Sequence, residues 1–309
     1  MFKPLIIVGG TPEIANIVPS DAVTERIASG FEFTEGPVWA NDGGLVFSDI
    51  PANKIYRWKP QEGVSVFRDA NLRDDSIAQA CAVLGPNGLT LDNRGRLTVC
   101  EHGNRRVSRF ETDGSLAVLA DHWRGRRLNS PNDLVWKSDG VLYFTDPPYG
   151  LPGRDQDPGK EIPFNGVYRV RDGEVELLHD GMSRPNGIAF SPDEKYLYVS
   201  NSDPEARYWK RFEVTADGRL GRDDVFFDAT ANRQDGNPDG LKLDCEGTLY
   251  CTGPGGIWLF SPEGRHLGTL CFPEVPANCQ WGDEDARTLY VTARTSVYRV
   301  RLNAVGIRP

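Results

Sequence analysis

Six polar residues recur at the start of six similar segments, and each carries a side-chain oxygen that can bind a cation. They are Glu35, Asn87, Asn132, Asn186, Asp239 and Asn278. Hard cations such as Ca²⁺ take about six to eight oxygen ligands, whereas Zn²⁺ prefers about four ligands drawn mainly from His and Cys. Neither His nor Cys stands at a leading position. The two carboxylates would balance one divalent ion, so these residues predict a calcium-type site if they meet in space.

Local turn chemistry is the alternative explanation for the same residues. Asn and Asp before Gly are common in turns, and a repeated turn needs the same residue each time for local reasons. Asn87 and Asn278 fit this interpretation as well as they fit a metal site. Glu35 fits it poorly, because Glu does not mimic a turn as Asn and Asp do. The spacing alone leaves both interpretations open.

The six segments share one pattern, in which the polar residue opens an apolar alternation that is followed by a turn and a second alternation. They read EGPVWANDGGLVFSD from Glu35, NGLTLDNRGRLTVC from Asn87, NDLVWKSDGVLYFT from Asn132, NGIAFSPDEKYLYVS from Asn186, DGLKLDCEGTLYCT from Asp239 and NCQWGDEDARTLYVT from Asn278. Four copies keep the same spacing to a turn glycine, and the copies from Asn186 and Asn278 carry one extra turn residue. Period-2 alternation around such turns is typical of β-hairpins.

Further strand-like runs lie between the hairpins, among them 54–58, 106–110, 166–170, 210–214, 256–260 and 296–300. Four short strands per repeat of about 40–50 residues are typical of a propeller blade. We therefore predict an all-β, six-bladed β-propeller with four-stranded antiparallel blades around a central channel. Residues 1–309 would form a single domain, with repeats from about 31 to 301 and residues 1–30 as an extension that supplies a closing strand. The leading residues would then face the channel at one height.

Composition indicates which classes of binding partner and which cellular compartments to expect. The formal net charge of -9 disfavours nucleic acid, which binds clustered Lys and Arg. No apolar run approaches the ~20 residues of a membrane helix, and none resembles a signal-peptide core. Six cysteines without CxxC spacing are expected to be buried thiols, although disulfides stay possible: Cys81, Cys100, Cys245, Cys251, Cys271 and Cys279. We expect a cytoplasmic protein with a small-molecule substrate, or a periplasmic or secreted one if a leader precedes this chain.

The segments EGPVW at Glu35, SPND at 130–133, RPNG at 184–187 and PDG at 238–240 resemble the metal-site motifs of the gluconolactonase/regucalcin (senescence marker protein) family of six-bladed propellers. CEHGNRRV and YFTDPPYG are more similar to its microbial gluconolactonase branch. The resemblance implies one divalent cation held by Glu35, Asn132, Asn186 and Asp239. Calcium is the expected ion, with Mg²⁺, Mn²⁺ or Zn²⁺ as alternatives. Ser130 stands where the regucalcin-type segment has an arginine.

The activity that this resemblance implies is the hydrolysis of a sugar lactone. A divalent cation can polarise the ester carbonyl and help to deprotonate water. Asp239 is the expected proton acceptor and Glu35 a fixed ligand. No GxSxG segment occurs, so a serine hydrolase is disfavoured. Two alternatives stay open: a phosphotriesterase-like hydrolase on the same calcium site, and a non-catalytic binding propeller with a structural metal.

Four residues are candidates for substrate binding. His102, just after a predicted strand, could contact substrate or shuttle a proton, although a lone His is more often structural. Asp146 and Tyr149 begin a Pro- and Gly-rich stretch that runs to about residue 165 and could cover the site or be a disordered surface loop. Arg184, two residues before Asn186, could partly replace the missing arginine or pair with an acid on the surface.

Overall fold

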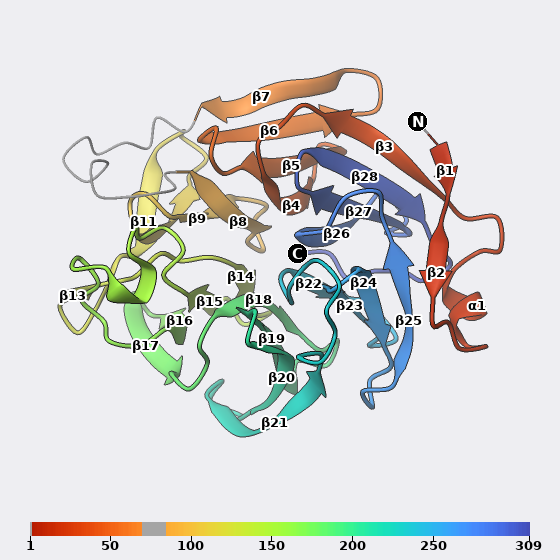
Figure 1. Cartoon of the computed structure of the whole chain (residues 1–309). Coiled ribbons are helices and arrows are strands. Elements are labelled where there is room, and N and C mark those ends of the chain that lie inside the picture. Colours follow the sequence, from red (N-terminus) through yellow and green to blue (C-terminus); the bar gives the residue numbers. More distant parts are fainter. Residues whose placement is uncertain (1, 70–84) are drawn as a thin grey trace.

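The computed structural model describes residues 2–69 and 85–309, and Cys81 lies outside them. Six sheets of antiparallel strands stand around one axis (Figure 1). The first strand of each predicted hairpin is the innermost strand of its blade, and the innermost strands of neighbouring blades contact one another. The predicted six-bladed propeller with four-stranded antiparallel blades is confirmed, and two blades gain a fifth strand. The five cysteines in the described ranges are free thiols.

The first three blades follow the chain from the inside outward. Blade 1 contains β4 (Thr34–Ala40), β5 (Gly44–Asp49), β6 (Lys54–Lys59) and β7 (Gly63–Asp69). Blade 2 contains β8 (Pro86–Leu91), β9 (Leu97–Glu101), β10 (Arg106–Phe110) and β11 (Leu116–Ala120). A two-stranded ribbon of β12 (His122–Trp123) and β13 (Arg126–Arg127) precedes blade 3. Blade 3 contains β14 (Leu134–Trp136), β15 (Leu142–Asp146), β16 (Gly166–Arg171) and β17 (Glu174–His179), with the 3₁₀-helix η2 (Arg154–Gln156) between β15 and β16.

Two of the last three blades include strands from the start of the chain. Blade 4 contains β18 (Pro185–Phe190), β19 (Tyr196–Asp203), β20 (Ala206–Val214) and β21 (Leu220–Asp228). Blade 5 contains β22 (Leu241–Leu243), β23 (Leu249–Gly253), β24 (Gly256–Phe260), β25 (His266–Cys271) and the added β2 (Ile6–Val8). Blade 6 contains β26 (Asn278–Gly282), β27 (Thr288–Ala293), β28 (Ser296–Arg301), β3 (Val23–Ser29) and the added β1 (Phe2–Pro4).

The ring is closed by pairing between the two ends of the chain. Strand β3 pairs antiparallel with β28, and an ion pair from Arg299 Nε to Glu25 Oε2 at 2.6 Å joins the same two strands. Helix α1 (Ile14–Ile17) connects β2 to β3 and packs Ile14 into the core beside blade 5. Closure in this way pairs the edge that β28 would otherwise expose. None of the described helices is long and apolar enough to span a bilayer.

The hydrophobic core is divided among the blade interfaces. The described residues form six buried clusters, and each lies between two neighbouring blades. The cluster between blades 6 and 1, for example, stacks Trp39 on Tyr290 with ring centroids 5.1 Å apart. Stacking of blades buries both faces of each sheet, so that a strand such as β5 is buried along its whole length.

The inner strands pack closely just after the leading residues. A Cβ at Gly187 would lie 2.2 Å from the backbone oxygen of Asp239, and a Cβ at Gly240 would lie 2.0 Å from Cγ of Asn278. These positions accept only glycine because the neighbouring inner strand occupies the space of any side chain. The glycine that follows a leading residue is thus required by contact between blades as well as by any local turn.

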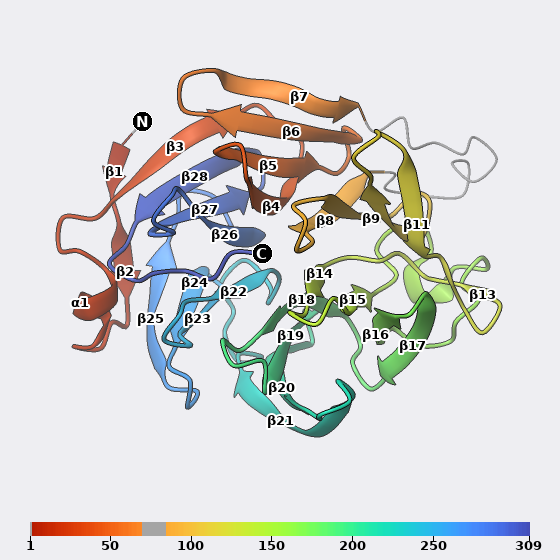
Figure 2. The ribbon, with the colours of Figure 1, turned by 180° about the vertical axis from the view of Figure 1, so that it is seen from behind.

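The C-terminal segment crosses the face of the ring opposite the leading residues. The backbone N–H of Gly306 donates to Ala286 O at 2.8 Å, and that of Ile307 donates to Leu243 O at 3.1 Å. The end of the chain therefore lies beside the axis, as both views show (Figures 1 and 2). This segment covers one mouth of the central channel, so substrate must approach the leading residues from the other face.

The close packing at the axis predicts the cost of one added methyl group. Gly187→Ala should lower the free energy of unfolding by about 3 kcal/mol, because the backbone atoms that it would meet cannot rotate away. Urea denaturation measures the change. Gly221→Ala is the matched control, since its Cβ would meet no atom closer than 3.4 Å. A Gly187→Ala protein as stable as the control would contradict this account of the axis.

Candidate active site

The six leading residues meet at one end of the central channel. Five of them are almost fully buried, and Asp239 is half-buried. The amide of Asn278 donates to Glu35 Oε2 at 3.0 Å, although 243 positions separate the two residues. The amide of Asn186 hydrogen-bonds Asp239. Ring closure therefore brings the sequence-distant Glu35 and Asp239 into one cluster of oxygen donors.

A second repeated position fixes the backbone of this cluster. The hydroxyl of Ser48 donates to the carbonyl of Asn87 at 2.7 Å, and that of Ser200 donates to the carbonyl of Asp239 at 2.7 Å. Thr145 makes the same bond to Asn186 at 2.8 Å. Each hydroxyl belongs to the second strand of one blade and holds the leading residue of the next blade. The leading side chains are thereby set at a common height.

Burial and mutual repulsion raise the pKa values of the two leading carboxylates. The pKa of Glu35 rises to about 7, first because of burial and then because of the nearby charge of Asp133. Burial also raises the pKa of Asp239 well above its usual range, with repulsion from Glu35 as the second cause. Hydrogen bonds from Gly36 N at 2.5 Å and from Asn278 only partly offset the effect on Glu35.

Asp133 is a third axial carboxylate that the sequence reasoning missed. It follows Asn132 at the position where four other repeats have glycine, and it is buried. Its Oδ1 accepts from Leu134 N at 2.9 Å, whereas its Oδ2 has no partner of standard hydrogen-bond geometry among the described residues. Asn278 and the Lys242 ammonium nevertheless lie near enough to lower its pKa, against the stronger effect of burial. The break in the glycine pattern was the available sequence signal.

These donors fit a divalent cation. The carboxylates of Glu35, Asp133 and Asp239 repel one another and share amide donors, and one buried oxygen of Asp133 has no regular hydrogen bond among the described residues. A cation among them would relieve the repulsion, and oxygen-only donors suit Ca²⁺ or Mg²⁺. Within residues 2–69 and 85–309, no group of three or more His, Cys, Asp or Glu side chains is arranged as a ready metal site. The predicted set contains only two such residues, since Asn132 and Asn186 would supply the rest.

His102 lies directly behind the leading ring. It is buried, and its Nε2 is 3.0 Å from the amide nitrogen of Asn87. Burial lowers the pKa of His102 to about 4, so the imidazole is neutral at neutral pH. A neutral ring whose Nε2 accepts from this amide carries its proton on Nδ1. The hydrogen bond between His102 and Asn87 orients the side chain of Asn87.

Asp146 is fully buried beneath the segment that precedes Asn132. Its two carboxylate oxygens accept from the backbone N–H groups of Asn129 at 2.7 Å and Ser130 at 2.8 Å. Burial raises the pKa of Asp146 to about 7. Ser130, in turn, donates to Pro147 O at 2.6 Å and accepts from Gly150 N at 2.8 Å. Asp146 and Ser130 thus join the segment that leads to Asn132 to the loop after β15.

The loop from 147 to 165 is attached to the body of the protein and brings Tyr149 to the rim of the site. Arg105 donates to Gly159 O at 2.9 Å, which anchors the loop. Burial raises the pKa of Tyr149 to about 12, while the hydroxyl of Ser202 and the charges of Asp239 and Arg184 also act on it. The disordered-loop alternative does not describe this segment.

Arg184 is paired with an acid and still lies at the rim. Its Nη1 forms an ion pair with Asp155 of the loop and donates to Ser183 O at 2.7 Å. Its backbone N–H donates to Asn201 Oδ1 at 2.7 Å. Its charge nevertheless reaches Tyr149. Both predicted roles of Arg184, pairing with an acid and lying beside the site, are compatible with this geometry.

The raised pKa of Glu35 predicts how pH affects the metal-free protein. Between its usual pKa of 4.5 and its value of about 7 in the folded chain, the folded state binds more protons than the unfolded state. The contribution of Glu35 to stability is therefore complete below about pH 4.5 and is lost as pH rises through about 7. We expect the free energy of unfolding of chelator-treated protein to fall across this window, and to fall less in Glu35→Gln. Urea denaturation at several pH values measures both slopes, and equal slopes would refute the assignment.

Known proteins resemble this chain along almost its whole length. The profile of the SMP-30/Gluconolactonase/LRE-like region matches residues 33–295. The gluconolactonase of Zymomonas mobilis is 38% identical over 96% of this chain and 86% of its own length. A gluconolactonase structure from Xanthomonas campestris superposes with a TM-score of 0.83 at 31% identity, covering 97% of this chain and 95% of that one. The calcium-binding protein regucalcin of Agrobacterium tumefaciens shares the fold, with a TM-score of 0.73, 19% identity and coverage of 92% and 95%. The chain therefore belongs to the SMP-30/gluconolactonase/LRE-like family.

Proposed function

We propose that this protein hydrolyses a sugar lactone with the help of one divalent cation, with calcium the expected ion. Glu35, Asn132, Asn186 and Asp239 would hold the ion. The observation that carries the proposal is the pair of neighbouring carboxylates, the buried Glu35 and the half-buried Asp239, which repel each other at the open end of an otherwise covered channel. The gluconolactonases among the relatives support a lactone as the substrate class.

The chemistry requires a polarised carbonyl, a deprotonated water and a leaving alkoxide that receives a proton. A divalent ion at the leading ring would supply Lewis-acid polarisation of the lactone carbonyl. Asp239 would accept a proton from the attacking water while the oxygen of that water forms a bond to the carbonyl carbon. The ring C–O bond then breaks, and the same proton can pass to the leaving oxygen.

The surroundings of the two carboxylates support different roles for them. Glu35 is 4% exposed, and its Oε2 already accepts hydrogen bonds from Gly36 and Asn278. It is therefore suited to be a fixed ligand. Asp239 is half-buried, and we propose that its carboxylate is the one that a water or substrate meets from the open face. This difference favours Asp239 as the base.

The rim residues divide into two groups in this proposal. Tyr149 and Arg184 lie beside Asp239 and are proposed to contact the hydroxyl groups of a sugar lactone. Asp146 and His102 are buried, and their described contacts are with the protein itself. We propose that Asp146 positions the segment that carries Asn132, and that His102 positions Asn87.

A lactone panel with and without chelator tests the function directly. Untreated protein should open aldonolactones, and chelator-treated protein should lose this activity and regain it when Ca²⁺ is added. A pH-indicator assay of acid release measures the rate. Demonstrably metal-free protein that turns over lactones at the untreated rate would overturn the metal mechanism. Turnover of phosphotriesters without lactones would favour the phosphotriesterase alternative, and no turnover of either would favour a binding propeller.

Two isosteric variants separate the base from the ligand. Asp239→Asn keeps a carbonyl oxygen but cannot accept a proton, so its turnover at saturating metal should fall by about 10²–10⁴-fold. Glu35→Gln removes the same charge from the same site without removing the proposed base, and it should retain more turnover once metal is saturating. Asn87→Ala should largely keep the metal. Equal, near-native turnover of Asp239→Asn and Glu35→Gln at saturating metal would show that Asp239 is only a ligand.

A further inference from the structure

A second ring of side chains lies one step farther along the inner strands. Each member pairs with the equivalent residue of the second strand of its blade. The six members are Val38, Thr90, Val135, Ala189, Lys242 and Gln280. All of them except Val38 line a cavity of about 150 Å³ on the axis, which Ile307, Arg308 and Pro309 also line. Lys242 is the one ionisable residue of this ring. The register thus places a single cation on the axis, below the leading carboxylates.

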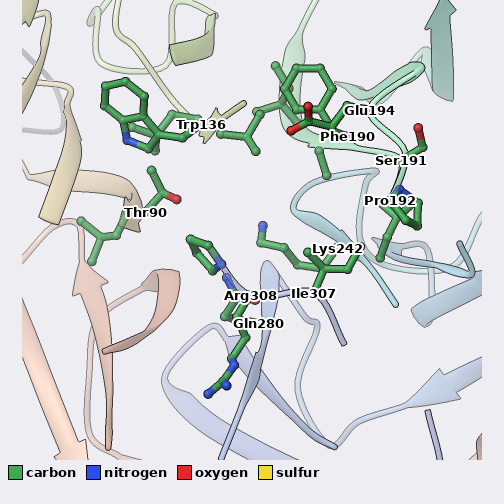
Figure 3. A pocket seen from close by; sticks show the side chains of 17 residues that line it. Thr90, Trp136, Phe190, Ser191, Pro192, Glu194, Lys242, Gln280, Ile307 and Arg308 are labelled. Atoms are coloured by element: carbon green, nitrogen blue, oxygen red, sulfur yellow. The ribbon is translucent and has the colours of Figure 1, made fainter. Parts of the chain in front are cut away.

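The ammonium group of Lys242 points into the open centre of this cavity (Figure 3). Its Nζ donates to Leu241 O at 3.0 Å. Other charged groups at the cavity are engaged elsewhere. Glu194 accepts from Ser138 N at 2.7 Å and pairs with Lys137 at 3.1 Å, and the guanidinium of Arg308 donates to Asp283 O at 2.8 Å. Of the two cations that line the cavity, Lys242 is the one that lowers the pKa values of Glu35 and Asp133.

Three carboxylates lie on the other side of the second ring from the cavity. Glu35 and Asp239 belong to the leading ring, and Asp133 follows Asn132. The attraction of Lys242 acts on Glu35 and on Asp133. When these groups are ionised, three negative charges and the one positive charge of Lys242 leave two negative charges on the axis. One divalent cation makes the total zero.

We propose that Lys242 is a fixed counter-ion whose charge matches the axial site to a divalent cation, which makes it a positioning residue for that site. The inference rests on the metal-dependent function proposed above. Because the C-terminal segment covers its side of the channel, the ammonium is a permanent part of the site. Without Lys242, three uncompensated carboxylates would bind a divalent ion more tightly. Their affinity for a trivalent ion would increase by a larger factor.

Four proteins test the proposal: wild type, Lys242→Met, Asp133→Asn and the double variant. Isothermal titration measures Ca²⁺ affinity, and luminescence measures Tb³⁺ affinity. Lys242→Met should bind Ca²⁺ about tenfold more tightly, because one neighbouring like charge is removed, and Tb³⁺ should gain by a larger factor. Asp133→Asn should weaken both ions. The double variant should return to near the wild-type Ca²⁺ affinity, because its net charge equals that of the wild type.

Gln280→Met is the matched control, since it places methionine in the same ring without changing charge. If Lys242→Met leaves both affinities at the values of this control, or weakens both, the counter-ion role is overturned. A metal-free arm separates this outcome from failure of the proposed function. In chelator-treated protein at a pH high enough to ionise the three carboxyl groups, Lys242→Met should lower the unfolding temperature, and the loss should shrink when Asp133→Asn is also present. Wild type that binds no divalent ion would refute the metal mechanism, and additive losses in the metal-free arm would refute the counter-ion.

Discussion

The close approach of six inner strands around one axis is the constraint on which the rest of the structure depends. The strands are so near that glycine is required where Gly187 faces the backbone of Asp239. The leading side chains must then share a small volume. Hydroxyls such as those of Ser48 and Ser200 hold the backbone at this point, so the carboxylates cannot relax outward. Their repulsion is a consequence of the packing that closes the ring.

The repeats supply the scaffold, and departures from the repeat supply the chemistry. Five of the six second-ring positions are uncharged, and Lys242 is the exception. Four repeats have glycine after the leading residue, and Asp133 replaces it in the third. Glu35 and Asp239 stand where the other repeats have Asn. Because every blade has the same backbone, each substitution changes the charge on the axis without moving the strands.

The rim of the site depends on contacts between the second and third blades and the loop that follows β15. Asp146 fixes two backbone amides before Asn132, and Arg105 holds the loop at Gly159. These buried polar groups connect the predicted ligand Asn132 to Tyr149, which lies near Asp239. The same network therefore positions both the predicted ligand Asn132 and the proposed substrate contact Tyr149.

The sequence by itself determined the six hairpins, the four-stranded blades and the register that aligns Glu35 with Asp239, because alternation and turn residues are local properties that the chain repeats. It also indicated an oxygen-rich site, since the leading positions lacked His and Cys. It did not reveal that Asp133 joins the axial carboxylates, or that Lys242 lies below them, because the other repeats carry no charge at either position. Nor did it show that Asp146 is engaged with backbone amides. Only the tertiary structure decided these points, because the field at the axis is a sum over residues that are hundreds of positions apart until the ring closes.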